Sequence, residues 1–343
     1  MATQKALYLP EPKVPVVIQE REINEPGPGE VLIEIHAAAL NPSDWKIQAL
    51  GILVTKFPIV LGIDSAGIVK KVGAGVTNVA VGDRVMHVGF RDVKNATFQQ
   101  YTIAPAEIVA KIPPGLTFNQ AATLPLAVSA AVTGLYDRNA PNSFGITPPW
   151  EEGGRGKYAG EPILVIGGAS GLGQQAIQFA KLSGFSPIIT TASPQNEAFL
   201  KSLGATHVID RSAPLPAAVQ AITTQPITRI FDAISSEETQ NAAYDALTPG
   251  GKLVIVLWNL VAAEKLVPEK RVEMVITTFW APERRELGKS LCAHLPALVE
   301  AGEIKPNNVE VLPGGLTGIP AGLEKLRKGV SALKLVAHPQ ETP

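Results

Sequence analysis

A glycine-rich turn after a short apolar run carries the clearest chemistry in this sequence. The run Ile-Leu-Val-Ile at 163–166 leads into Gly-Gly-Ala-Ser-Gly-Leu-Gly at 167–173. Glycines permit a tight turn and let the backbone approach a phosphate, and a helix that starts there offers free N–H groups and a partial positive charge. We therefore expect a dinucleotide pyrophosphate to bind here. The residues expected to hold it are Gly168, Ala169, Ser170, Gly171, Leu172 and Gly173.

The residues that follow this turn predict a parallel sheet covered by helices. Leu172, Ala176, Phe179 and Ala180 recur at the spacing of one helix face. Further strand-like runs, each separated from the next by a helical pattern, lie at 186–191, 206–209, 228–232 and 251–257. This alternation is typical of βαβ units.

The first 125 residues predict a small, curled β domain instead. Strand-like segments at 31–35, 68–72 and 82–85 are separated by prolines and glycines. The segment 138–160 is rich in Pro, Gly and Asn, and we expect it to be an exposed loop. A helix at 284–301 leads to a tail with a strand-like end, which local pattern alone does not assign to either domain.

Composition excludes several classes of protein. A length of 343 residues favours two domains. The net charge of −1, without a basic block, predicts no nucleic-acid partner. Neither a run of 18 apolar residues nor a signal-peptide pattern is present, so we expect no membrane association. One cysteine, Cys292, excludes an internal disulfide and fits a reducing, cytoplasmic location.

Seven motifs in order resemble those of the medium-chain dehydrogenase/reductase superfamily, over essentially the whole chain. Besides the glycine turn they lie at 41–46, 62–69, 72–76, 81–85, 124–133 and 201–205. The resemblance implies an α/β protein with a GroES-like, β-rich catalytic domain at 1–126 and 282–343. It also implies a Rossmann domain, a doubly wound parallel sheet that binds NADP, at 127–281, and an active site in the cleft between the two.

The positions that bind zinc in the zinc-dependent members carry other residues here. Their Gly-His-Glu segment is Gly-Ile-Asp at 62–64, and the first half of the chain has no cysteine. Zinc prefers Cys and His ligands in tetrahedral sets. Cys292 alone cannot form a four-cysteine structural site, and the five histidines show no ligand spacing. We therefore expect no metal.

The sequence looks like the zinc-free branch, which contains quinone oxidoreductases and enoyl reductases. Asn-Pro-Ser-Asp-Trp-Lys at 41–46, the insert at 138–160 and Thr-Ala-Ser-Pro at 191–194 are most similar to fungal ToxD-like oxidoreductases and trans-acting enoyl reductases. Mitochondrial enoyl reductases carry a tyrosine a few residues after this Asn-Pro-Ser-Asp. Ile-Gln-Ala-Leu follows here at 47–50, so that proton donor is missing.

The strand after the glycine turn favours NADPH over NADH. NAD-specific sites place Asp or Glu about 20 residues past the glycines, to bind the ribose 2′-OH. Here that strand ends Thr-Thr-Ala-Ser at 190–193, without a carboxylate. We expect Ser193 and Asn196 to contact a 2′-phosphate, with Arg211 or Lys201 supplying positive charge. Asn196 could equally be a helix N-cap, and Lys201 an exposed helix residue.

Without zinc, reduction of a polarised C=C bond or of a quinone fits better than alcohol oxidation. The cofactor would deliver hydride, and the protein would have to stabilise the oxyanion that develops on the acceptor. Lys46 is the candidate electrostatic partner or proton source, because its motif lies at the cleft in related enzymes. Asp44 and Thr133 are further catalytic candidates, although Asp44 could cap a helix and Thr133 could be an ordinary helix residue.

Large apolar side chains could form the acceptor pocket, although each alone is more often part of a core. The candidates are Trp45, Phe90, Trp258, Phe279 and Trp280. Trp258 and Trp280 follow the last two predicted sheet strands, near the carboxyl edge where ligands bind in such folds.

Three functions remain open from the sequence. The first is an NADPH-dependent reductase of enones, enals or enoyl thioesters, and the second is an NADPH:quinone reductase. The third is an NADPH-binding accessory protein with little catalysis. An acyl carrier domain is a possible partner, and the chain could be a monomer or a homodimer. A basic docking patch would involve Lys265, Lys270, Arg271, Arg284 and Arg285, which a solvated loop and helix explain equally.

Overall fold

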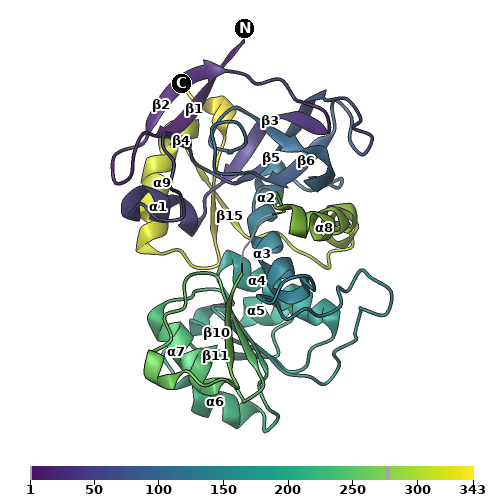
Figure 1. Ribbon diagram of the computed structural model, residues 1–343, viewed down its shortest axis with the longest axis vertical. Helices are drawn as coiled ribbons and strands as arrows, with labels where there is room; N and C mark the ends of the chain where they lie inside the picture. The colour runs from purple at the N-terminus through teal and green to yellow at the C-terminus, as the bar shows by residue number, and fades with distance from the viewer. Residues whose placement is uncertain (1, 276–278) are drawn as a thin grey trace. The chain divides into compact units, whose positions relative to one another are not determined.

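The computed structural model describes residues 2–275 and 279–343, and its chain divides into two compact units (Figure 1). The first unit comprises Met1–Leu126, Phe279–Glu300 and Pro306–Pro343. The second comprises Ala127–Thr278 and the short segment Ala301–Lys305.

Two sheets build the described part of the first unit. The smaller has the order β2-β1-β4, and the larger the order β15-β16-β3-β5-β6-β8, with β7 also paired to β3. The C-terminal tail thus joins this unit through β16, which pairs with β3 in antiparallel fashion. The bounds are β1 Thr3–Leu9, β2 Val17–Glu22, β3 Glu30–Ala39, β4 Ile59–Val60, β5 Asp64–Val72, β6 Arg84–Val88, β7 Tyr101–Pro105, β8 Val109–Lys111, β15 Val309–Leu312 and β16 Lys334–Ala337.

Buried apolar clusters form the core of this unit. Val31, Ile33, Val69 and Val85 point to one buried cluster from β3, β5 and β6. A second cluster contains Ile35 of β3 together with apolar residues of the helices α1 and α9. The helix bounds are α1 Pro42–Leu50, α2 Phe118–Ala121, α8 Pro282–Glu300 and α9 Ile319–Lys328.

The second unit holds the parallel sheet that the sequence predicted. Its order, β11-β10-β9-β12-β13-β14, places the first strand in the middle, as in a doubly wound nucleotide-binding fold. All of its strand pairs are parallel. The predicted fold class is confirmed. The bounds are β9 Ile163–Ile166, β10 Ile188–Ala192, β11 His207–Asp210, β12 Arg229–Asp232, β13 Lys252–Ile255 and β14 Arg271–Met274.

Short, buried strands alternate here with helices. The β9 strand is completely buried, as expected for a central strand that is covered on both faces. The helix α4 begins at Gly171, within the glycine turn, and α5 ends before Gly204, which has a positive φ. The helix bounds are α3 Pro125–Tyr136, α4 Gly171–Ser183, α5 Glu197–Leu203, α6 Leu215–Ile222 and α7 Glu237–Ala246.

Polar residues of α4 are buried as deeply as its apolar face. The side-chain amides of Gln175 and Gln178 donate to the backbone oxygen of Lys305, at 3.1 and 3.3 Å, and Gln178 Oε1 accepts from the Lys305 N–H. These bonds satisfy buried polar groups and hold the segment Ala301–Lys305 on this unit.

The segment 138–160 is a loop, as predicted, and most of residues 151–160 are exposed, but residues 142–150 are packed against the unit. Trp150 packs edge-to-face on Tyr136 of α3 and on Phe179 of α4, with ring centroids 5.5 and 6.0 Å apart, and Ile146 is buried. The prolines and glycines do prevent regular structure, but the apolar side chains between them still gain by leaving water.

Among the described residues, no helix is long and apolar enough to cross a bilayer.

Candidate cofactor and active site

The glycine turn has the geometry that close approach to a phosphate requires. Gly167 has a φ of +76°, and a Cβ on Gly168 would lie 2.2 Å from Thr190 Oγ1. A Cβ on Gly173 would lie 2.2 Å from the oxygen of Gly167. Ser170 caps α4 by accepting the Gly173 N–H at 3.0 Å. Each glycine is therefore required where it stands, and α4 begins at this turn with the partial positive charge of a helix N-terminus.

Two neighbouring strand ends hold this turn in place, and the sequence did not single them out. Thr191 of β10 accepts the Gly167 N–H through Oγ1 at 3.0 Å. Asp232, at the end of β12, is fully buried and accepts the N–H groups of Ile234 and Ser235, both at 2.9 Å. The Ile234 side chain in turn lies against Gly167. A carboxylate at the end of a buried strand was the signal that could have found Asp232.

The predicted 2′-phosphate residues gather beside the carboxyl end of β10. Ala192 pairs with Asp210 of β11, so the next residues, Ser193 and Arg211, are neighbours across the two strands. Ser193 begins the 3₁₀ turn Pro194–Asn196, and the Arg211 N–H donates to the Ala192 oxygen at 3.0 Å. The Asp210 carboxylate is bonded to Ser212.

Two of the other candidates near this strand already make contacts within the protein. Asn196 is buried in the short turn before α5, and its backbone N–H donates to the Ser193 oxygen. Lys201 pairs with Glu197 one turn earlier on α5, at 2.7 Å. Of the two predicted cations, Arg211 is therefore the one beside Ser193.

The first turn of α1 carries three of the predicted residues in different environments. Asp44 is buried and accepts the Asn41 N–H at 2.7 Å, which caps the helix as one alternative predicted. Burial raises the pKa of Asp44 to about 7, although the Asn41 N–H and Arg91 oppose this shift. Lys46 is half-buried, and burial lowers its pKa. Its ammonium lies 5.7 Å from the centroid of the Trp45 ring.

A buried polar network that the sequence did not predict anchors the start of this helix. Lys334 of β16 donates to Asp64 Oδ2 at 2.9 Å and to Asn41 Oδ1 at 2.6 Å. Asn41 Nδ2 donates to the same Asp64 oxygen at 2.8 Å. The other Asp64 oxygen accepts the Leu126 N–H, at the start of α3, at 2.6 Å. Asp64 is fully buried, so Lys334 is the cation that compensates its charge.

The remaining catalytic and pocket candidates lie in separate surroundings. Thr133 is completely buried in α3, and its hydroxyl has no hydrogen-bond partner in the described part of the chain. Phe90 and Trp280 lie together, with ring centroids 5.5 Å apart, and Trp280 Nε1 donates to the Val88 oxygen. Phe279 is buried against Gly288 of α8.

The two predicted tryptophans fall in different units. Trp258 follows β13 in the second unit and is 47% exposed. Trp280 belongs to the first unit, although it comes only six residues after the last residue of β14.

The predicted basic patch does not form one exposed surface. Arg284 is 5% exposed. Lys265 pairs with Asp245, and Arg285 pairs with Glu107. The Lys270 ammonium donates to the Tyr244 oxygen and lies over that residue's ring. This arrangement favours the alternative of ordinary, locally paired surface charges.

The donor set does not fit a zinc ion. Residues 2–275 and 279–343 contain no cluster of three or more His, Cys, Asp or Glu side chains that could hold a metal. Ile63 is apolar, and Asp64 already binds Lys334 and Leu126. Cys292 lies within α8, where burial raises the pKa of its thiol to about 12. Zinc binds the thiolate, which that environment disfavours.

Comparisons with known proteins agree with the two-part architecture. Residues 27–114 match the family described as alcohol dehydrogenase GroES-like domain, and residues 171–291 match the one described as zinc-binding dehydrogenase. The chain is 33% identical to the trans-enoyl reductase himH of Aspergillus japonicus, over 90% of this chain and 89% of that protein.

Two further proteins show how broadly this architecture is used. The enoyl reductase component lovC of the lovastatin nonaketide synthase, from Aspergillus terreus, is 32% identical over 90% of this chain and 89% of that protein. The structure of a quinone oxidoreductase from Coxiella burnetii superposes with a TM-score of 0.73 at 26% identity. It covers 98% of this chain and 99% of that one.

The buried network predicts a large effect of removing its cation. Lys334→Met leaves the Asp64 carboxylate buried without a counter-charge, and we expect the free energy of unfolding to fall by about 3–5 kcal/mol. The control Lys70→Met removes an exposed lysine paired with Glu34 and should cost less than about 1 kcal/mol. Urea unfolding followed by circular dichroism measures both. Equal losses in the two variants would contradict the role of Lys334.

Asp44 predicts a pH-dependent stability difference. Its pKa is near 7 in the folded protein and near 3.8 when unfolded, so the folded state binds the extra proton between these values. Its contribution to stability therefore falls as the pH rises from 4 to 7. Asp44→Asn removes this pH-dependent loss. The free energy of unfolding of the variant should therefore rise relative to that of the original chain as the pH increases from 4.5 to 7.5. The exposed control Asp245→Asn should give a difference that does not change with pH.

Proposed function

Because this chain belongs to the medium-chain dehydrogenase/reductase superfamily, whose members are oxidoreductases that typically use a nicotinamide cofactor, we propose that it is a zinc-independent, NADPH-dependent reductase of activated C=C bonds. The substrate class is an enone, an enal or, preferentially, an enoyl thioester. The observation that carries this proposal is the full-length likeness to fungal proteins named as enoyl reductases, at 32–33% identity.

The cofactor proposal is supported by the surroundings of the glycine turn. The turn and the start of α4 would bind the pyrophosphate through backbone N–H groups. Beside β10, the hydroxyl of Ser193 and the guanidinium of Arg211 would bind the 2′-phosphate of NADPH. Bound NADPH would supply the hydride that reduces the acceptor carbon.

Lys46 is the residue that we propose to act on the acceptor oxygen. Reduction of a C=C bond conjugated to a carbonyl places negative charge on that oxygen, and a nearby cation stabilises it. Lys46 is charged and half-buried, so its field is screened less than that of an exposed lysine. Its lowered pKa would also ease donation of a proton. Phe90 and Trp280 remain candidates for the apolar wall, as does Trp258.

A panel of acceptors tests the proposed reaction. The purified chain should oxidise NADPH, followed at 340 nm, with crotonyl-N-acetylcysteamine and with an enone such as 1-octen-3-one. It should not reduce NADP⁺ when secondary alcohols are supplied as substrates. Turnover of quinones alone would favour the quinone reductase alternative. Tight NADPH binding without any turnover would favour the accessory protein.

Removal of the Lys46 charge should affect the chemical step. We expect Lys46→Met to lower kcat for the crotonyl thioester about 100-fold, the loss typical of one oxyanion-stabilising group. The Kd for NADPH, measured by quenching of tryptophan fluorescence, should change less than twofold. The control is Lys56→Met, which removes an exposed lysine. A normal kcat in Lys46→Met would remove this residue from the mechanism.

Cofactor choice can be tested at Ser193. Ser193→Asp places a carboxylate beside the proposed 2′-phosphate site, where it repels NADPH and can bind the ribose hydroxyls of NADH. We expect kcat/KM for NADPH to fall at least 30-fold, equivalent to about 2 kcal/mol, while that for NADH stays equal or rises. Parallel losses with both cofactors would indicate damage to the fold and not a change in recognition.

A further inference from the structure

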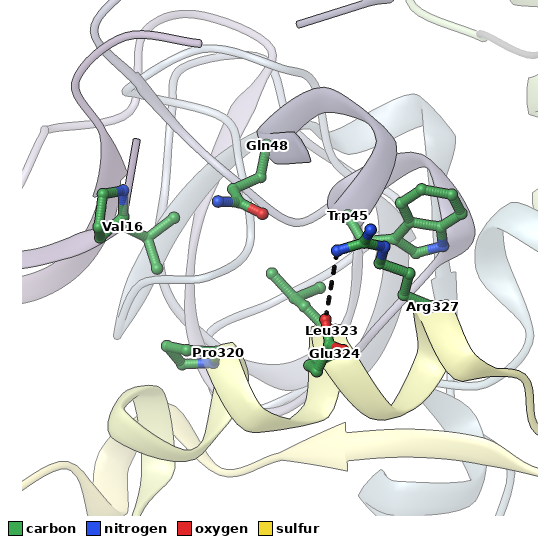
Figure 2. A pocket seen from close by; sticks show the side chains of 8 residues that line it. Val16, Trp45, Gln48, Pro320, Leu323, Glu324 and Arg327 are labelled. Atoms are coloured by element: carbon green, nitrogen blue, oxygen red, sulfur yellow. Dashed lines mark ion pairs between the residues drawn. The ribbon is translucent and has the colours of Figure 1, made fainter. Parts of the chain in front are cut away.

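Arg91, in the loop that follows β6, holds a guanidinium for which the described residues provide no acceptor. It is partly buried, and its Nε is buried without a hydrogen-bond partner in residues 2–275 and 279–343. Figure 2 shows a contrasting arginine, Arg327, which pairs with Glu324 at 3.6 Å beside a hollow between α1 and α9. A guanidinium kept from water without an acceptor is costly, so a ligand that supplies one would stabilise Arg91.

The carboxylates around this loop are already bound elsewhere. Asp92, the next residue, accepts the backbone N–H groups two and three residues further on, at 2.8 and 2.6 Å. Asp64, beside the end of β6, is neutralised by Lys334. Asp44 is the acid whose charge acts on Arg91, but it caps α1, and burial raises its pKa to about 7. The positive charge of Arg91 is therefore available to an anion.

Hydrogen bonds fix the loop that carries Arg91. The Gly89 N–H donates to the Ile63 oxygen at 2.7 Å, and the Phe90 N–H donates to the Asn95 oxygen at 3.0 Å. A Cβ on Gly89 would lie 2.6 Å from the same Asn95 oxygen, so the loop closes tightly. A guanidinium on a fixed loop loses little freedom when it binds a ligand, which favours binding.

The same loop carries one of the predicted acceptor residues. Phe90, next to Arg91, is 43% exposed, and its ring centroid lies 5.5 Å from that of Trp280. An apolar surface beside a fixed cation suits a ligand with an apolar part and one anionic end. The planar guanidinium matches a carboxylate best, because the two groups can form parallel N–H···O bonds.

We propose that Arg91 binds a free carboxylate on the hydride acceptor, and that the acceptors of this chain include 4-oxo-2-enoates, in which a ketone and a carboxylate flank one C=C bond. The inference rests on the proposed function, because it concerns the acceptor of that reaction. One carbon of the C=C bond takes the hydride and the other takes a proton, while the carboxylate is unchanged. Lys46 would act on the ketone oxygen, and Arg91 would hold the opposite end of the molecule.

Kinetics with three related acceptors test this role. They are trans-4-oxo-2-pentenoate, its methyl ester and 3-penten-2-one, which has no carboxyl group. We expect Arg91→Met to lower the ratio of kcat/KM for the acid to that for the ester at least about tenfold, the effect of one charge-assisted bond. The value for 3-penten-2-one should change less than about twofold. Arg91→Lys should keep part of the ratio, and the control Arg327→Met should keep all of it.

Binding of the reduction product gives a readout that needs no turnover. Levulinate, the product of the acid, should quench tryptophan fluorescence with a Kd at least about tenfold lower than that of methyl levulinate, and Arg91→Met should abolish the difference. An unchanged Kd for levulinate in Arg91→Met would overturn the inference. Acetate that binds as tightly as levulinate would do so too, because it would identify a general anion site.

The outcomes separate this inference from the proposed function. Reduction of 3-penten-2-one with an unchanged acid-to-ester ratio in Arg91→Met would overturn the carboxylate role and leave the proposed function standing. Equal losses for all three acceptors in Arg91→Met and Arg91→Lys would assign Arg91 to the fold and would also overturn it. Levulinate binding that depends on Arg91, without reduction of any acceptor, would refute the proposed function and leave the carboxylate site standing.

Discussion

The contact between Lys334 and Asp64 is the constraint on which the first unit depends. A fully buried carboxylate is costly unless a cation and hydrogen-bond donors meet it, and Asp64 receives both from Lys334, Asn41 and Leu126. These partners come from β16, the start of α1 and the start of α3. One charge thus fixes the C-terminal tail against the β-rich core and sets where the helix that carries Lys46 begins.

Buried hydrogen bonds also hold the glycine turn of the second unit in place. Steric limits at Gly168 and Gly173 make the turn tight, while Thr191 and Asp232 satisfy backbone N–H groups at and beside it. The first turn of α4 adds the partial positive charge of a helix N-terminus, and Ser170 caps it by accepting the Gly173 N–H. A rigid turn at a helix N-terminus would suit binding of a pyrophosphate, since no reorganisation precedes it.

Within residues 2–275 and 279–343, no set of His, Cys, Asp or Glu side chains fits a metal ion, which bears on what the first unit would supply. In the zinc-dependent relatives, the resemblance places a histidine where Ile63 stands and a glutamate where Asp64 stands. Here Asp64 is bound to an ammonium group, so a cation still lies at the start of α1, but it is structural and buried. The proposed function therefore assigns the electrostatic help for the acceptor to another residue, the half-buried Lys46.

The fold class, the parallel sheet and the glycine turn could be predicted from the sequence, because they follow from local periodicity, glycine placement and an ordered set of motifs. The polar network could not be predicted, because it depends on contacts that form only on folding. Lys334 is 270 residues from Asp64, and no local pattern indicates which lysine neutralises a buried carboxylate. The same reason applies to the packed insert around Trp150, where apolar residues find partners that only folding brings near.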